Sequence, residues 1–60
     1  MDTDTAIRRL DHAHKVTGEV LPWLLKVRMG RAEYQKVLVE VDAAMLHLDR
    51  AMYLLERLEE

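Results

Sequence analysis

The thirty residues from Arg31 to Glu60 contain neither glycine nor proline, and apolar residues recur among them at helical spacing. Most of these residues are Ala, Leu, Met, Glu or Arg, which favour helices. We therefore predict one long amphipathic helix whose apolar arc, about 100° wide, faces a core. Three neighbouring rows form that arc: Tyr34, Val41, Leu48 and Leu55; Val37, Ala44, Ala51 and Leu58; and Leu38, Met45 and Met52.

A second apolar row, here called the outer strip, consists of Val39, Leu46 and Tyr53 and lies on the opposite side of this predicted helix. Aligned apolar residues between charged rows favour a second contact surface. Three scattered surface hydrophobes are the alternative interpretation, because single exposed apolar residues are common. The flanking rows are the mostly acidic Gln35, Asp42, Asp49 and Glu56 and the mostly basic Lys36, Ala43, Arg50 and Arg57.

The first half of the chain predicts another amphipathic helix, over about residues 4–28, with N-cap candidates between Asp2 and Thr5. We expect a kink near Gly18–Pro22, because proline cannot donate to the carbonyl four residues back; two separate short helices are the alternative. The rows expected to face inward are Ala6, Ala13, Val20 and Val27, and Leu10, Thr17 and Leu24, with Ile7, Leu21, Val16 and Trp23 beside them.

A tight turn at about residues 29–31 should join this helix to a second one at about 31–59, with Gly30 as a left-handed C-cap. A connection this short favours an antiparallel αα-hairpin. In that hairpin, two residues that face each other, one from each helix, have residue numbers that add up to about 60. The predicted fold is thus all-α, with residues 1–60 as one helical-hairpin domain.

Two helices alone cannot cover apolar faces this wide, and a chain of 60 residues is marginally stable by itself. We expect two hairpins to form an antiparallel four-helix bundle with coiled-coil-like packing. The residues expected to carry self-association are Leu10, Leu24, Val41, Met45, Leu48, Met52 and Leu55.

The residues offer little for catalysis or metal binding. The sequence has no Cys and no Ser, no carboxylate falls in the predicted core, and no glycine-rich loop is present, so we expect no enzyme and no cofactor. Asp11 and His14 have an i,i+3 spacing used in di-iron bundles, and His47 should lie level with His14. Because the further inward Glu ligands are missing, we expect ordinary histidines and no metal.

Charge is unevenly placed: residues 1–31 carry +2 and residues 32–60 carry −4, which suits the two halves lying side by side. The Lys and Arg residues of the first half form no continuous stripe, so nucleic acid is an unfavoured partner. We expect no membrane partner, no secretory signal after the acidic N-terminus, and a cytoplasmic location.

Val37-Leu38, Ala44, Leu48-Asp49-Arg50 and Leu54-Leu55, with Gly18-Glu19-Val20 upstream, resemble the helical metal-sensing repressors of the copper-sensor type. The resemblance implies α-helical dimers or tetramers that bind DNA. The cysteine ligand of that family is missing here, so metal sensing is not carried over.

The sequence therefore predicts a small non-enzymatic protein–protein interaction module that self-associates and binds or occludes a larger protein, as an adaptor or inhibitor. A small helical DNA-binding transcriptional regulator, acting as a dimer or tetramer, is the alternative. Aromatic residues dominate binding hot spots. The residues expected to bind the partner protein are Trp23, Val39, Leu46 and Tyr53.

Overall fold

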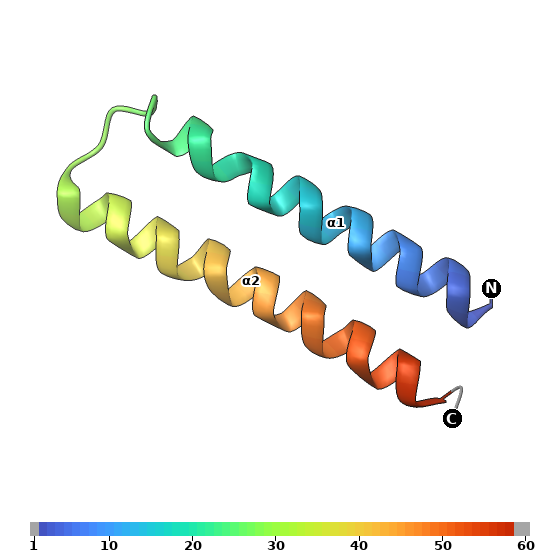
Figure 1. The fold of residues 1–60 in the computed structure, drawn as a ribbon. Coiled ribbons are helices and arrows are strands. Elements are labelled where there is room, and N and C mark those ends of the chain that lie inside the picture. Colours follow the sequence, from blue (N-terminus) through green and yellow to red (C-terminus); the bar gives the residue numbers. More distant parts are fainter. Residues whose placement is uncertain (1, 59–60) are drawn as a thin grey trace.

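The computed structural model describes residues 2–58, which form two α-helices, α1 (Thr3–Leu24) and α2 (Arg31–Leu58), joined by residues 25–30. The helices run antiparallel and side by side, so the start of α1 and the end of α2 lie at the same end of the molecule (Figure 1). The Cα atoms span 46 × 15 × 13 Å. The predicted all-α helical hairpin is confirmed.

The start of α1 is fixed by Asp2, which is the N-cap one residue before the helix. The backbone N–H of Thr5 donates to Asp2 Oδ1 over 2.7 Å. Hydrogen bonds from the side chain of Thr5 and from its backbone lower the pKa of Asp2 below the usual 3.8, because they stabilise the ionised carboxylate. The helix begins one residue earlier than the predicted Asp4.

The end of α1 lies at Leu24, four residues before the predicted boundary. The helix is continuous through Gly18 and Pro22, so the alternative of two short helices is wrong. Pro22 has no N–H to donate to the Gly18 carbonyl, and the helix ends within the next turn. After Leu24 the backbone hydrogen bonds reach back three residues instead of four. The Lys26 N–H donates to the Trp23 carbonyl at 3.0 Å, and the Val27 N–H donates to the Leu24 carbonyl at 3.2 Å.

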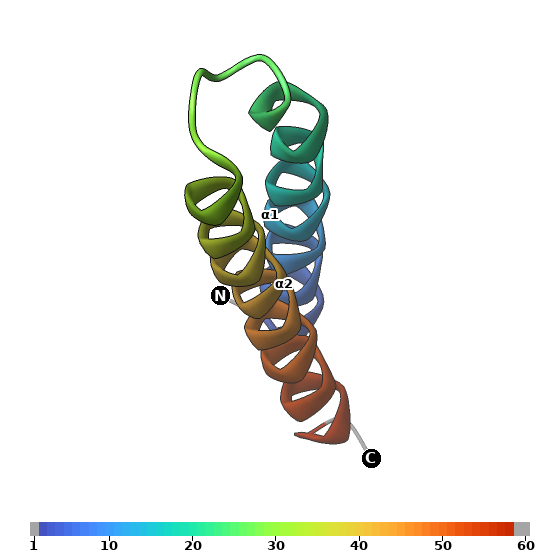
Figure 2. The same cartoon turned by 90° about the vertical axis from the view of Figure 1, so that its left-hand side faces the viewer.

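Gly30 caps the start of α2 and not the end of α1. Neither glycine has a positive φ, so the predicted left-handed C-cap is wrong. The carboxylate of Glu33 accepts from the Gly30 N–H at 3.1 Å, and the Gly30 carbonyl accepts from the Tyr34 N–H at 2.9 Å. This is half of a capping box. The connection is therefore the six-residue arch of residues 25–30 seen in Figure 2, in place of a tight turn at 29–31.

The contact between α1 and α2, here called the seam, has a register set by two observed contacts. His14 Nε2 lies 3.4 Å from Asp49 Oδ1. The terminal methyl of Met45 lies over Gly18, 3.5 Å from where a Cβ would stand. In both contacts the residue numbers sum to 63 and not to the predicted 60, because the longer connection shifts α2 by about three residues. His14 therefore lies level with Asp49 and not with His47.

Leu24, with 8% of its surface exposed, is the one buried residue among residues 2–58. The rest of the seam is half-buried. On α1 the seam is rotated relative to the prediction: Val20, expected inward, is 40% exposed. Val27, also expected inward, lies beyond the end of α1 and is 54% exposed. Ile7 and Leu21, expected at one side, are half-buried instead.

Candidate interaction surfaces

The seven residues predicted to carry self-association all lie along the seam within one chain. Leu24 is buried and the other six are half-buried. On α2 these residues recur with alternating spacings of three and four, on the side of the helix whose Met45 contacts Gly18. The hairpin therefore shields Leu48, Met52 and Leu55 in part and leaves the remainder of each side chain in solvent.

The two edges of the seam differ in chemistry. One edge carries His14 and Gly18 of α1 against Asp49 and Met45 of α2. Helical periodicity places Ala13 and Val20 of α1 on the other edge, because they lie more than a quarter-turn around the helix from His14 and Gly18. On α2 the corresponding edge carries Val37, Ala44, Ala51 and Leu58.

This second edge continues into an exposed apolar surface across both helices, here called the open face. From α1 it contains Val16, 45% exposed, and Val20. Ala13, Ala44 and Ala51 lie near its middle, so no long side chain projects from the backbone there. The open face is bordered by Trp23 on α1, 64% exposed, and by Leu54 and Leu58 on α2, 61% and 76% exposed.

The outer strip lies in solvent along the side of α2 that faces away from α1. Val39, Leu46 and Tyr53 are 65%, 49% and 58% exposed. Trp23, predicted to join them in binding a partner, lies on α1 and at the border of the open face. The structure therefore does not bring the four predicted partner-binding residues together: three share one surface, and Trp23 belongs to another.

A basic side chain lies over the ring of each exposed aromatic residue on these surfaces. Lys26 Nζ lies 4.5 Å from the centroid of the Trp23 ring, and Arg57 Cζ lies 5.7 Å from that of Tyr53. Such contacts are worth about 0.5–1 kcal/mol at exposed sites. Each cation covers part of its ring, and Trp23 and Tyr53 still remain 64% and 58% exposed.

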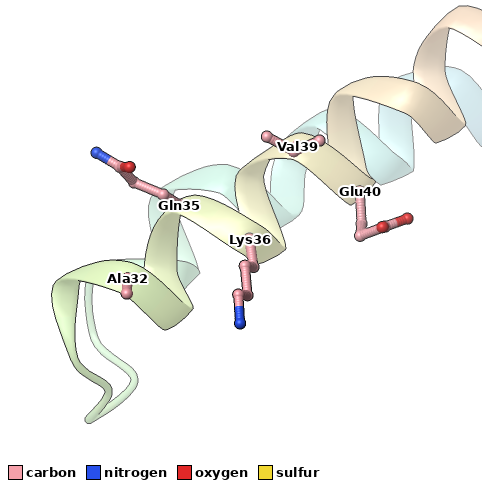
Figure 3. A pocket seen from close by; sticks show the side chains of 5 residues that line it. All are labelled: Ala32, Gln35, Lys36, Val39 and Glu40. Atoms are coloured by element: carbon pink, nitrogen blue, oxygen red, sulfur yellow. The ribbon is translucent and has the colours of Figure 1, made fainter.

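A shallow hollow lies at the beginning of the outer strip, between successive turns of α2 (Figure 3). Its lining comes from α2 alone, and every residue of it is exposed. A site for a small molecule is a concave pocket that buries most of its ligand. This hollow is open and formed by one helix, so it encloses no ligand in that way. The lining residues are Ala32, Gln35, Lys36, Val39 and Glu40.

Over residues 2–58, no group of three or more His, Asp or Glu side chains is placed to hold a metal ion. His14 pairs with Asp49 across the seam, and Lys15 Nζ lies 3.4 Å from Asp11 Oδ2, one turn away on the same helix. Within the same described part of the chain, neither helix has a stretch long and apolar enough to cross a membrane.

None of the family models, curated proteins and solved structures compared with the chain matches it. The resemblance to helical copper-sensing repressors therefore gains no support from these comparisons.

The open face was only partly anticipated from the sequence. The inward rows included Val20, Ala44 and Leu58, but Val16 was placed beside the core and Leu54 was not assigned to a surface. A signal was present, since Ala13, Val16, Val20 and Trp23 follow one another at spacings of three, four and three. The row containing Ile7 and Leu21 carries the same kind of spacing, so periodicity alone does not decide which row meets α2.

Proposed function

We propose that this protein is a small non-enzymatic interaction module that self-associates through its apolar helix faces and binds or occludes a larger protein through the outer strip. In this proposal it acts as an adaptor or inhibitor in the cytoplasm, by covering a surface of its target. Hairpins that pair into a four-helix bundle are the form of self-association it requires.

The observation that carries the proposal is the amount of surface left exposed by one chain. The accessible surface is 5120 Å² for a mass of 7.0 kDa. Folded monomers of this mass expose about 4,000 Å². The excess of about 1,100 Å² is comparable with the roughly 800 Å² that each partner buries in a standard protein interface. A second chain placed on the apolar faces accounts for an excess of this size.

The outer strip supports the second part of the proposal. It is apolar, exposed by 49% to 65% at each position, and flanked by a mostly acidic row and a mostly basic row. An apolar centre with a charged rim is the composition of a protein-binding patch. Because the strip faces away from α1, a target can occupy it without unfolding the hairpin.

The test compares proteins captured from the native cell by wild type, Leu46→Asp and the control His12→Asp. Leu46→Asp places a charge in the strip, whereas His12→Asp places the same charge at an exposed position of α1. We expect a partner to be retained by wild type and the control and lost with Leu46→Asp, while the helical circular dichroism signal stays the same. Equal recovery by all three would contradict a role for the strip. Capture of DNA that weakens steeply with added salt would instead favour a DNA-binding regulator.

A further inference from the structure

We propose that the open face is the self-association surface, and that a second copy docks on it with its α2 against the α1 of the first copy. This inference rests on the proposed self-association and adds the face and the pairing of helices. The open face extends across both helices, whereas the outer strip follows one helix.

The shape of the open face suits a second hairpin. The short side chains of Ala13, Ala44 and Ala51 make its centre shallow, and the longer side chains of valines and leucines surround them. Small residues at the centre allow helices to approach closely, and larger residues can then fill the space between the layers. Four helices arranged in this way cover the half-buried seam residues on the side of the open face, which a single hairpin leaves in solvent.

Two arrangements place one open face on another, and both have two-fold symmetry. If the two-fold axis runs parallel to the helices, α1 packs on α2 of the second copy. The numbers of residues that face each other between the copies then have about the same sum as within one chain. If the axis runs perpendicular to the helices, α1 packs on α1 and α2 on α2. In a closed dimer both copies use the same surface in either case.

Charge favours the first arrangement. α1 has three Lys or Arg and three Asp or Glu residues and is neutral, whereas α2 has four Lys or Arg and five Asp or Glu residues and carries −1. Packing α1 on α2 of the second copy keeps the two negative helices apart, whereas the other arrangement packs α2 on α2.

The central rows also match in size in this arrangement. The register brings Ala6 level with Leu58, Ala13 with Ala51, and Val20 with Ala44 of the second copy. Val20 and Ala44 both lie on the middle of the open face, one on each helix. This pair is therefore the most direct reporter of whether α1 meets α2 across the interface.

The chain has no cysteine, so cysteines can be introduced at single positions without background. Val20→Cys and Ala44→Cys are made separately, mixed, allowed to exchange subunits and oxidised. We expect the mixed disulfide to exceed either self-disulfide by about tenfold, because the bond requires Cβ atoms about 3.8 Å apart. Self-disulfides of Val20→Cys as the main product would overturn the proposed pairing of helices. Circular dichroism of the reduced variants shows whether each remains helical.

A second comparison tests the face itself. Val20→Asp should convert the dimer to a monomer, and Leu46→Asp, with its charge on the outer strip, should leave the dimer intact. Loss of the dimer in Leu46→Asp and its retention in Val20→Asp would overturn the assignment of the open face but leave self-association standing. A wild-type protein that is monomeric throughout would overturn the proposed function itself.

Discussion

His14 on α1 and Asp49 on α2 lie 3.4 Å apart across the seam and mark the height at which the two helices face each other. Together with Met45 over Gly18, this contact assigns one edge of the seam to polar and small residues. The apolar edge is consequently the opposite one, where the open face begins. The relationship therefore fixes both the register of the hairpin and the side on which a second chain finds apolar surface.

Leu24 should be the most costly single position for stability. It is the one buried residue of the described chain, at 8% exposure, and truncation of a buried leucine removes apolar contacts and leaves a cavity. We expect Leu24→Ala to lower the free energy of unfolding by about 2–3 kcal/mol. The adjacent Leu25→Ala is the matched control, since Leu25 is 75% exposed and should change stability by less than about 0.5 kcal/mol. Urea unfolding of the two variants checks this, and equal losses would contradict the assigned core.

Gly18 should tolerate alanine and gain from it. An added Cβ would lie 3.5 Å from the Met45 methyl, an ordinary van der Waals distance, and glycine costs about 1 kcal/mol relative to alanine inside a helix. We expect Gly18→Ala to raise the free energy of unfolding by about 0.5–1 kcal/mol. Thermal unfolding at fixed protein concentration measures the change. A fall in stability would show that α1 and α2 approach more closely at Gly18 than the structure has them.

Substitution of Gly30 distinguishes the observed cap at the start of α2 from a left-handed cap at the end of α1. Because its φ is not positive, alanine requires no strained backbone there, and the new Cβ would meet Glu33 at 3.6 Å or more. We expect Gly30→Ala to change stability by less than about 1 kcal/mol, since alanine is the poorer N-cap but is less flexible when unfolded. Glu33→Ala, which removes the acceptor for the Gly30 N–H, should cost about 0.5–1 kcal/mol, with Glu40→Ala as control. A loss well above 1 kcal/mol in Gly30→Ala would support the left-handed geometry.

The hairpin was predictable because two amphipathic stretches flank a single break in the helical pattern. The helix boundary at Leu24 was not, since Pro22 was expected to kink the first helix near Gly18–Pro22, with the helix continuing to about residue 28. The predicted connection was therefore too short, and the predicted sum of facing residue numbers was 60, where the structure has 63. The rotation of α1 was missed because two apolar rows overlap on it, and the packing against α2 selects between them through contacts such as Met45 on Gly18.

Asp2 should make the start of α1 sensitive to acid. Its pKa is lowered in the folded protein by the hydrogen bonds from Thr5, so its contribution to stability is fully present above the usual 3.8 and is lost as the pH falls through the lower folded value. We expect Asp2→Ala to unfold at a lower temperature than wild type at pH 7, and the difference to shrink below pH 3.8. Melting curves of both proteins over this range test it, with Glu19→Gln as a control far from the cap, near the other end of α1. A difference that persists unchanged at pH 2 would contradict the cap.

The most direct test of self-association is sedimentation equilibrium of the wild-type protein over a range of micromolar concentrations, together with its melting temperature at each concentration. A chain that leaves this much apolar surface exposed should sediment at a multiple of 7.0 kDa, and its melting temperature should rise with concentration, because dilution favours the separated chains. A helical, cooperatively melting species of 7.0 kDa whose melting temperature does not depend on concentration would contradict the account.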